Sequence, residues 1–160
     1  MAALRAQAVG YEAADASVVA VAGDLIVVAL RERDGSTMSI ADDVNGAYTL
    51  AVTRAITVAR AGIWYFRNSG GGTLTFTVTG GSIRDYNVSV WSGMQDVAVD
   101  TTNNAGGTAT SHAHGSLTPS AQAVVVSAMG SGSHGGVTPH SGFTALTIHA
   151  SATAPVCASL

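Results

Sequence analysis

His112 and His114 have the residue types and spacing that most readily suggest chemistry in this 160-residue chain. Residues i and i+2 of an extended strand face the same side, so both imidazoles could bind one metal ion. The remaining histidines follow in the same part of the chain: His134, His140 and His149. Structural zinc sites usually add cysteine or carboxylate ligands at tighter spacing. His112 and His114 are therefore the candidate metal ligands, and the favoured alternative places the histidines in polar loops without a metal.

An acidic segment, Asp42-Asp43-Val44-Asn45-Gly46, supplies oxygen atoms of the kind that bind calcium. It lacks the ligand spacing and the final glutamate of an EF-hand loop. Asp and Asn side chains also bond to their own backbone in turns. Asn45-Gly46 is a pair favoured in type I′ hairpin turns, because both residues tolerate positive φ. We favour the hairpin interpretation over a calcium site.

An aromatic cluster could form a platform for sugar binding, and its members are Trp64, Tyr65, Phe66, Tyr86 and Trp91. In a strand, Trp64 and Phe66 share one face while Tyr65 lies on the other. At least one face must belong to the core, because each aromatic side chain buries a large apolar area. Core packing is therefore the favoured interpretation, and a glycan-binding platform is the alternative.

Catalytic signatures are missing from the sequence. Ser, His and Asp all occur, but no G-x-S-x-G elbow places them together. Gly70-Gly71-Gly72 precedes a predicted strand, whereas phosphate-binding glycine loops open a helix. Cys157 stands close to Pro155 without a residue that would activate its thiol. We therefore expect no enzyme and no organic cofactor.

Charge is confined to one part of the chain. The sixty residues after Asp100 contain no Asp, Glu, Lys or Arg, and charged residues make up 11% of the whole chain. Soluble domains usually carry about 25%. A surface without charge lacks the usual protection against pairing with other proteins. The composition therefore predicts a part of a larger assembly, most simply a homo-oligomer.

Several partners and locations are excluded by the same composition. The net charge is −3 and the seven arginines are scattered, so no basic stripe predicts nucleic-acid binding. The longest apolar run, Leu25–Leu30, is too short for a membrane span or a signal peptide. The single cysteine requires no oxidising compartment. We expect synthesis in the cytosol.

Short strands separated by glycine-rich turns dominate the chain. The clearest is Thr73–Thr79, whose alternation places Leu74, Phe76 and Val78 on the core face and four threonines on the other. Further strands are predicted at Leu25–Arg31, Ala47–Val52, Gly62–Arg67, Tyr86–Trp91, Thr108–His114, Ala123–Met129 and Phe143–Ser151. Residues 1–16 have few apolar anchors and are predicted to be an N-terminal arm. Residues 17–160 should form one antiparallel β-sandwich, of jelly-roll or immunoglobulin-like type.

The order of these motifs resembles a β-sandwich module of phage and bacterial surface proteins. The matching segments are Ala22–Ala29, Asp42 to Tyr48, Ile63–Arg67, Gly71–Thr79, Ser89–Gly93 and, later, Gly142-Phe143-Thr144. The resemblance implies a structural role in a virion or on a cell surface, and it implies no catalytic residues. Such modules usually continue through further strands, so either the sheet is shorter here or a neighbouring chain supplies the missing strand by strand addition.

From composition and resemblance together we expect a phage virion structural protein. The favoured type is a capsid decoration (cement) subunit that contacts copies of itself and the major capsid protein or other virion proteins. The alternative is a receptor- or glycan-binding sandwich module of a tail or fibre. The first predicts buried aromatic side chains, and the second predicts an exposed aromatic cluster.

Overall fold

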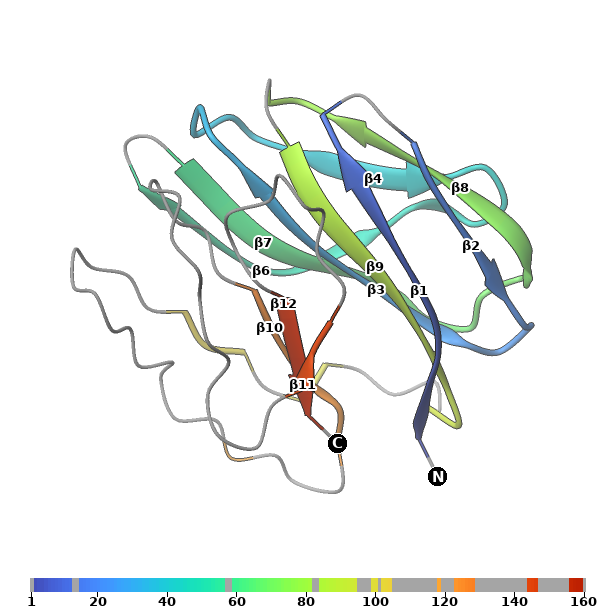
Figure 1. The fold of residues 1–160 in the computed structure, drawn as a ribbon. Helices are drawn as coiled ribbons and strands as arrows, with labels where there is room; N and C mark the ends of the chain where they lie inside the picture. The colour runs from blue at the N-terminus through green and yellow to red at the C-terminus, as the bar shows by residue number, and fades with distance from the viewer. Residues whose placement is uncertain are drawn as a thin grey trace.

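The computed structural model describes residues 2–12, 15–56, 59–81, 84–94, 99–100, 102–104, 118, 123–128, 144–146 and 156–159. Within these ranges the chain forms β-strands and no helix. No described segment is a helix that could cross a membrane. Two antiparallel sheets pack face to face, so the prediction of an all-β sandwich is confirmed (Figure 1).

The larger sheet has five strands. In spatial order they are β1 (Ala3–Tyr11), β9 (Arg84–Ser92), β3 (Leu25–Glu32), β7 (Ala59–Phe66) and β6 (Thr49–Ile56). The central strand β3 pairs with both β9 and β7, and Val28 lies opposite Val88 on one side and Trp64 on the other. Both edge strands contain a bulge, near Arg5 in β1 and near Ala51 in β6.

The smaller sheet of the sandwich has four strands, β2 (Ala16–Ala20), β8 (Gly72–Thr79), β4 (Ser39–Asp42) and β5 (Gly46–Ala47). Its long strand β8 shows the predicted alternation. Leu74 and Phe76 are completely buried and Val78 is partly buried. Thr73, Thr77 and Thr79 are exposed and Thr75 is half-buried, as expected for a sheet with one face on the core.

A small third sheet covers the other face of the five-stranded sheet. It consists of β10 (Val125–Ala128), β12 (Val156–Ser159) and β11 (Thr144–Ala145). Strand β10 contacts β3 and β7, and Figure 1 shows the third sheet on the side away from β2, β8 and β4. The strand predicted at Thr108–His114 lies outside the described residues, and of the one predicted at Phe143–Ser151 only β11 is described as a strand.

Two apolar clusters follow from this layering. The main core lies between the five- and four-stranded sheets and includes Ile26, Val28, Trp64, Leu74 and Phe76. A second cluster, between the five-stranded sheet and the C-terminal segment, includes Val27, Ala29, Trp91 and Leu146. The central strand β3 therefore buries both of its faces, which explains why its sequence is an unbroken apolar run.

The segment predicted as one strand, Ala47–Val52, is two strands in different sheets. The chain crosses between the sheets at Tyr48. The Tyr48 ring is buried, with its centroid 5.5 Å from that of Phe66 and 5.7 Å from that of Phe76. The Tyr48 amide donates to the Ile40 carbonyl at 2.9 Å, which fixes the crossing point to β4.

The N-terminal segment, predicted as an arm over residues 1–16, contains edge strand β1. The backbone of β1 pairs with β9 from Ala3 opposite Ser92 to Tyr11 opposite Asp85. Gly10 lies directly over the Tyr86 ring. A Cβ at this position would overlap the ring, so only glycine fits here. The Tyr86 hydroxyl in turn accepts a hydrogen bond from the Ala16 amide at 2.9 Å. Backbone pairing thus ties down a segment that has few large apolar side chains.

Candidate interaction surface

The predicted metal ligands, His112 and His114, lie outside the described residues, as do His134, His140 and His149. The metal site therefore stays a prediction. Within the described ranges, no three His, Cys, Asp or Glu side chains are grouped in a way that could hold a metal ion.

The acidic segment predicted as a hairpin turn uses its carboxylates on its own backbone. Asp42 Oδ1 accepts from the amides of Val44 at 2.7 Å and Asn45 at 2.6 Å. Its Oδ2 accepts from Asn45 Nδ2 at 2.9 Å and from the Tyr48 hydroxyl at 2.6 Å. Only Gly46 has positive φ in this turn, so the type I′ geometry expected for Asn45-Gly46 is wrong. The turn is longer, with three residues between the paired Asp42 and Gly46.

Tyr48 is the core partner of this turn. Burial raises the pKa of the Tyr48 hydroxyl well above its usual range, and the hydrogen bond to the Asp42 carboxylate raises it further. The hydroxyl therefore stays protonated and serves as a donor. Because each carboxylate oxygen of Asp42 already accepts two hydrogen bonds, the geometry favours the hairpin interpretation over a calcium site.

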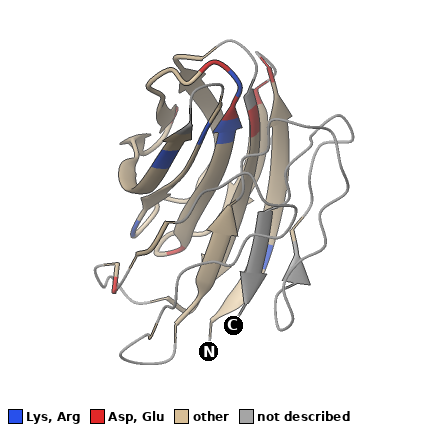
Figure 2. Ribbon diagram, turned by 90° about the vertical axis from the view of Figure 1, so that its left-hand side faces the viewer, with Lys and Arg blue, Asp and Glu red and all other residues tan. Residues whose placement is uncertain are grey.

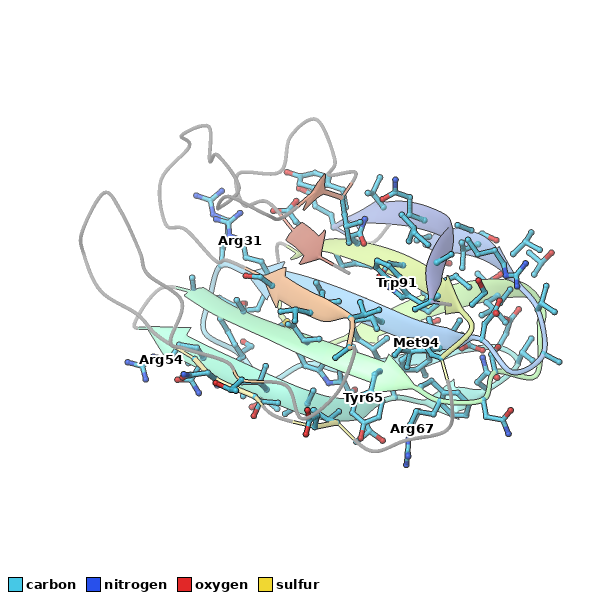
Figure 3. All side chains as sticks on the ribbon, turned by 90° about the horizontal axis from the view of Figure 1, so that it is seen from below. Arg31, Arg54, Tyr65, Arg67, Trp91 and Met94 are labelled. Atoms are coloured by element: carbon cyan, nitrogen blue, oxygen red, sulfur yellow. The ribbon has the colours of Figure 1, made fainter. Side chains whose placement is uncertain are left out.

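The predicted aromatic cluster is divided between the two faces of the five-stranded sheet. Trp64 and Tyr86 are buried in the main core, and Phe66 packs against it. Trp91 is buried in the second cluster, and Tyr65 packs there with Met94 (Figure 3). The Trp91 indole donates to Ser89 Oγ at 2.9 Å. These aromatic side chains therefore act as core residues and do not form one exposed platform.

Charged side chains gather at one end of the sandwich (Figure 2). This charged end is where β1, β3 and β6 finish and where β7 and β9 begin. Its buried ion pair joins Arg31 Nη1 to Asp85 Oδ2 at 2.9 Å, with the two side chains 5% and 8% exposed. Glu32, the residue after Arg31, is completely buried. Its Oε2 accepts a hydrogen bond from the Asp34 amide at 2.7 Å. Burial is the main cause that raises the pKa of Glu32.

The outward face of the four-stranded sheet is different in character. Its outward residues alternate with the buried ones, and the register places them side by side: Ser17, Val19, Ser39, Ala41, Ala47, Thr73, Thr75, Thr77 and Thr79. No member of this set carries a charge, and every one is exposed or half-buried. We call this set the uncharged face.

Three loops meet at the end of the sandwich opposite the charged end, and we call residues 21–24, 43–45 and 67–71 the loop end. Hydrogen bonds join all three loops. The Gly23 amide donates to the Ser69 carbonyl at 2.9 Å, and the Gly70 amide donates to Asn45 Oδ1 at 2.9 Å. Asn45 Nδ2 also donates to Ser69 Oγ at 3.3 Å.

Two valines of the loop end remain exposed. Among the apolar side chains of these loops, Val21 is 49% and Val44 is 50% exposed. Val19, at the adjoining edge of the uncharged face, is 60% exposed. Loop tips usually carry polar residues. Apolar side chains on loops fixed by hydrogen bonds are typical of a preformed contact surface.

Sequence reasoning missed the polar anchors of the two ends. Asp24 accepts from the Val21 amide at 2.9 Å, and it also pairs with Nε of Arg5, a residue of strand β1, at 2.8 Å. The residues of the Arg31–Asp85 pair are even further apart in sequence. One available signal was the position of Arg31 directly after the apolar run of β3, where a charged residue at the end of a buried strand requires a partner.

No protein-family model, curated protein or solved structure matches this chain. The resemblance to modules of phage and bacterial surface proteins therefore stays a prediction.

Proposed function

We propose that this chain is a structural subunit of a phage virion, of the capsid-decoration type. It acts by attachment to copies of itself and to other virion proteins such as the major capsid protein. The observation that carries the proposal is the uncharged face, nine outward residues on four neighbouring strands without a charged side chain. Surfaces that stay free in solution usually have about 25–35% charged residues.

The chemistry of the uncharged face suits burial against protein. Thr, Ser and Ala side chains lose little conformational entropy when they are covered, and they carry no charge that must be desolvated. Threonine and serine hydroxyls both donate and accept, so they can satisfy the polar groups of many protein surfaces. The charged end, with exposed Arg33 and Asp34, is suited to the solvent side of an attached subunit.

Glycan binding, the alternative function, has less support from the described residues. A sugar platform requires exposed aromatic rings that share one face. Trp64, Tyr86 and Trp91 are each 5% exposed or less, and they lie on different faces of the five-stranded sheet. Their positions favour a core role.

Association with particles tests the proposed function. An antibody raised against the purified protein would follow it through density-gradient centrifugation of an induced lysate from the source strain. We expect it in the fraction that contains virions, and we expect urea at moderate concentration to release it before the shell breaks. Recovery only among small soluble proteins would contradict the proposal. A glycan array with the same protein would detect the alternative function.

A further inference from the structure

We propose that the uncharged face packs against the same face of a second copy, around a two-fold axis parallel to β8. The proposal shares the uncharged face with the proposed function and identifies the partner that covers it. It does not require that the assembly be a virion.

The exposed valines are arranged for such a self-complementary contact. On one flank of β8, Val19 of β2 lies opposite Thr73. On the other flank, the Asp43 amide donates to the Thr75 carbonyl at 3.2 Å, which places the neighbouring Val44 beside the first residues of β8. A two-fold axis parallel to β8 exchanges the two flanks. Val19 of one copy then meets Val44 of the other, twice, as a two-fold interface requires.

The threonine row of β8 fits the same symmetry. Thr73, Thr75, Thr77 and Thr79 lie along the axis, so each row faces its own copy. A hydroxyl is both donor and acceptor and can therefore bond to another hydroxyl, whereas a row of like charges would repel its copy. Two sheets packed face to face lie about 10 Å apart, a distance that short side chains from both sheets can bridge.

The area of the contact supports a footprint that includes the loop end. The four strands contain 5, 8, 4 and 2 residues, which at the strand spacing and rise of a sheet give a face of about 300 Å². Specific complexes bury about 800 Å² per partner. The loop end, with its exposed valines, lies next to the uncharged face and enlarges the footprint. The sheet face alone would give a weaker complex.

The composition of the footprint argues against other kinds of partner. Nucleic acids and anionic membranes are bound through Lys and Arg, and membrane interfaces are rich in Trp and Tyr. Apart from the half-buried Arg67 of the loop end, the footprint contains none of these residues. The carboxylate at the rim, Asp43, accepts a hydrogen bond from the Thr75 amide at 2.8 Å.

The mass of the purified protein in solution tests the proposal. Light scattering after size exclusion, over a wide range of concentration, should give twice the monomer mass of 16.0 kDa. The variant Thr77→Arg places a charge in the centre of the face and should weaken dimerisation by about a hundredfold or more. The matched control Thr49→Arg alters an exposed threonine of β6 in the other sheet and should leave the mass unchanged. Urea unfolding of both variants shows that they are folded.

A cross-linking experiment tests the orientation. In a Cys157→Ser background, an oxidised mixture of Val19→Cys and Val44→Cys chains should form mixed dimers in preference to Val19–Val19 dimers. A monomer at all concentrations, equal masses for wild type and Thr77→Arg, or predominance of Val19–Val19 cross-links would overturn the proposal. If the protein is a monomer yet sediments with virions, the proposed function stands and this inference fails. If the protein is a dimer that does not sediment with virions, this inference stands and the proposed function fails.

Discussion

Replacing Asp42 by Asn should show how strongly the turn between β4 and β5 is tied to the core. The Asp42 carboxylate accepts the Tyr48 hydroxyl at 2.6 Å, and Tyr48 is 8% exposed. An asparagine keeps the oxygen that accepts the Val44 and Asn45 amides, but its NH₂ group cannot accept from Tyr48. A hydrogen bond to a charged group is lost and a buried hydroxyl is left without an acceptor, which should lower the free energy of unfolding by about 3 kcal/mol. Tyr48→Phe removes only the hydroxyl and should cost about 1.5 kcal/mol.

Urea unfolding of the two single variants and the double variant measures the coupling between these residues. Tyr48→Phe relieves the unpaired hydroxyl that Asp42→Asn creates, so the double variant should be about 1.5 kcal/mol less destabilised than the sum of the single variants. Asp43→Asn is the matched control, because exposed Asp43 accepts one amide through an oxygen that asparagine retains, and its effect should stay below about 0.5 kcal/mol. Additive effects at Asp42 and Tyr48 would refute the reasoning.

Three further predictions concern the charged end, β1 and the second apolar cluster. Because burial raises the pKa of Glu32 above its ordinary value of 4.5, ionisation opposes folding, and the free energy of unfolding contributed by this group should fall as the pH rises above about 4.5. Glu32→Gln should remove this slope and stabilise the protein near neutral pH, as urea midpoints across a pH series would measure. Deletion of residues 2–11 should lower the free energy of unfolding by about 3 kcal/mol or more, because it uncovers Tyr86 and the edge of β9. Unchanged stability after this deletion would instead favour the arm interpretation. Trp91→Ala should cost about 3–5 kcal/mol and make the C-terminal segment more sensitive to protease, as urea unfolding and digestion time courses would measure.

Clear local patterns made two strands predictable. Thr73–Thr79 alternates without a break, and the apolar run from Leu25 is bounded by turn residues, so both appear as β8 and β3. Strand β1 was not predicted, because its sequence has small side chains and its position depends on backbone pairing with a strand about eighty residues away. Propensity and periodicity describe local preference and cannot detect such a partner.

The candidate surface could be predicted only in part. The four outward threonines of β8 were expected from alternation, and the core role favoured for the aromatic residues agrees with the burial of Trp64, Tyr86 and Trp91. The neighbours of those threonines on β2, β4 and β5 depend on sheet order, which the sequence pattern does not specify. On β9, Asn87 and Ser89 alternate with the core residues Val88 and Val90, yet both are buried because the C-terminal segment covers that side. A third layer formed by short strands leaves no clear alternation to detect.

The pairing of β1 with β9 also sets an order of events during synthesis. The residue opposite Ala3 is Ser92, so β1 cannot pair with β9 until almost ninety further residues have been synthesised. At a translation rate of about 5–20 residues per second this interval lasts about 4–18 seconds. Strand β2 likewise waits for β8, with Ala16 opposite Phe76. The nascent chain therefore carries two unpaired strands with few charges to prevent their pairing with other newly made chains. Its yield in the cell should depend on the chaperones that bind it during those seconds.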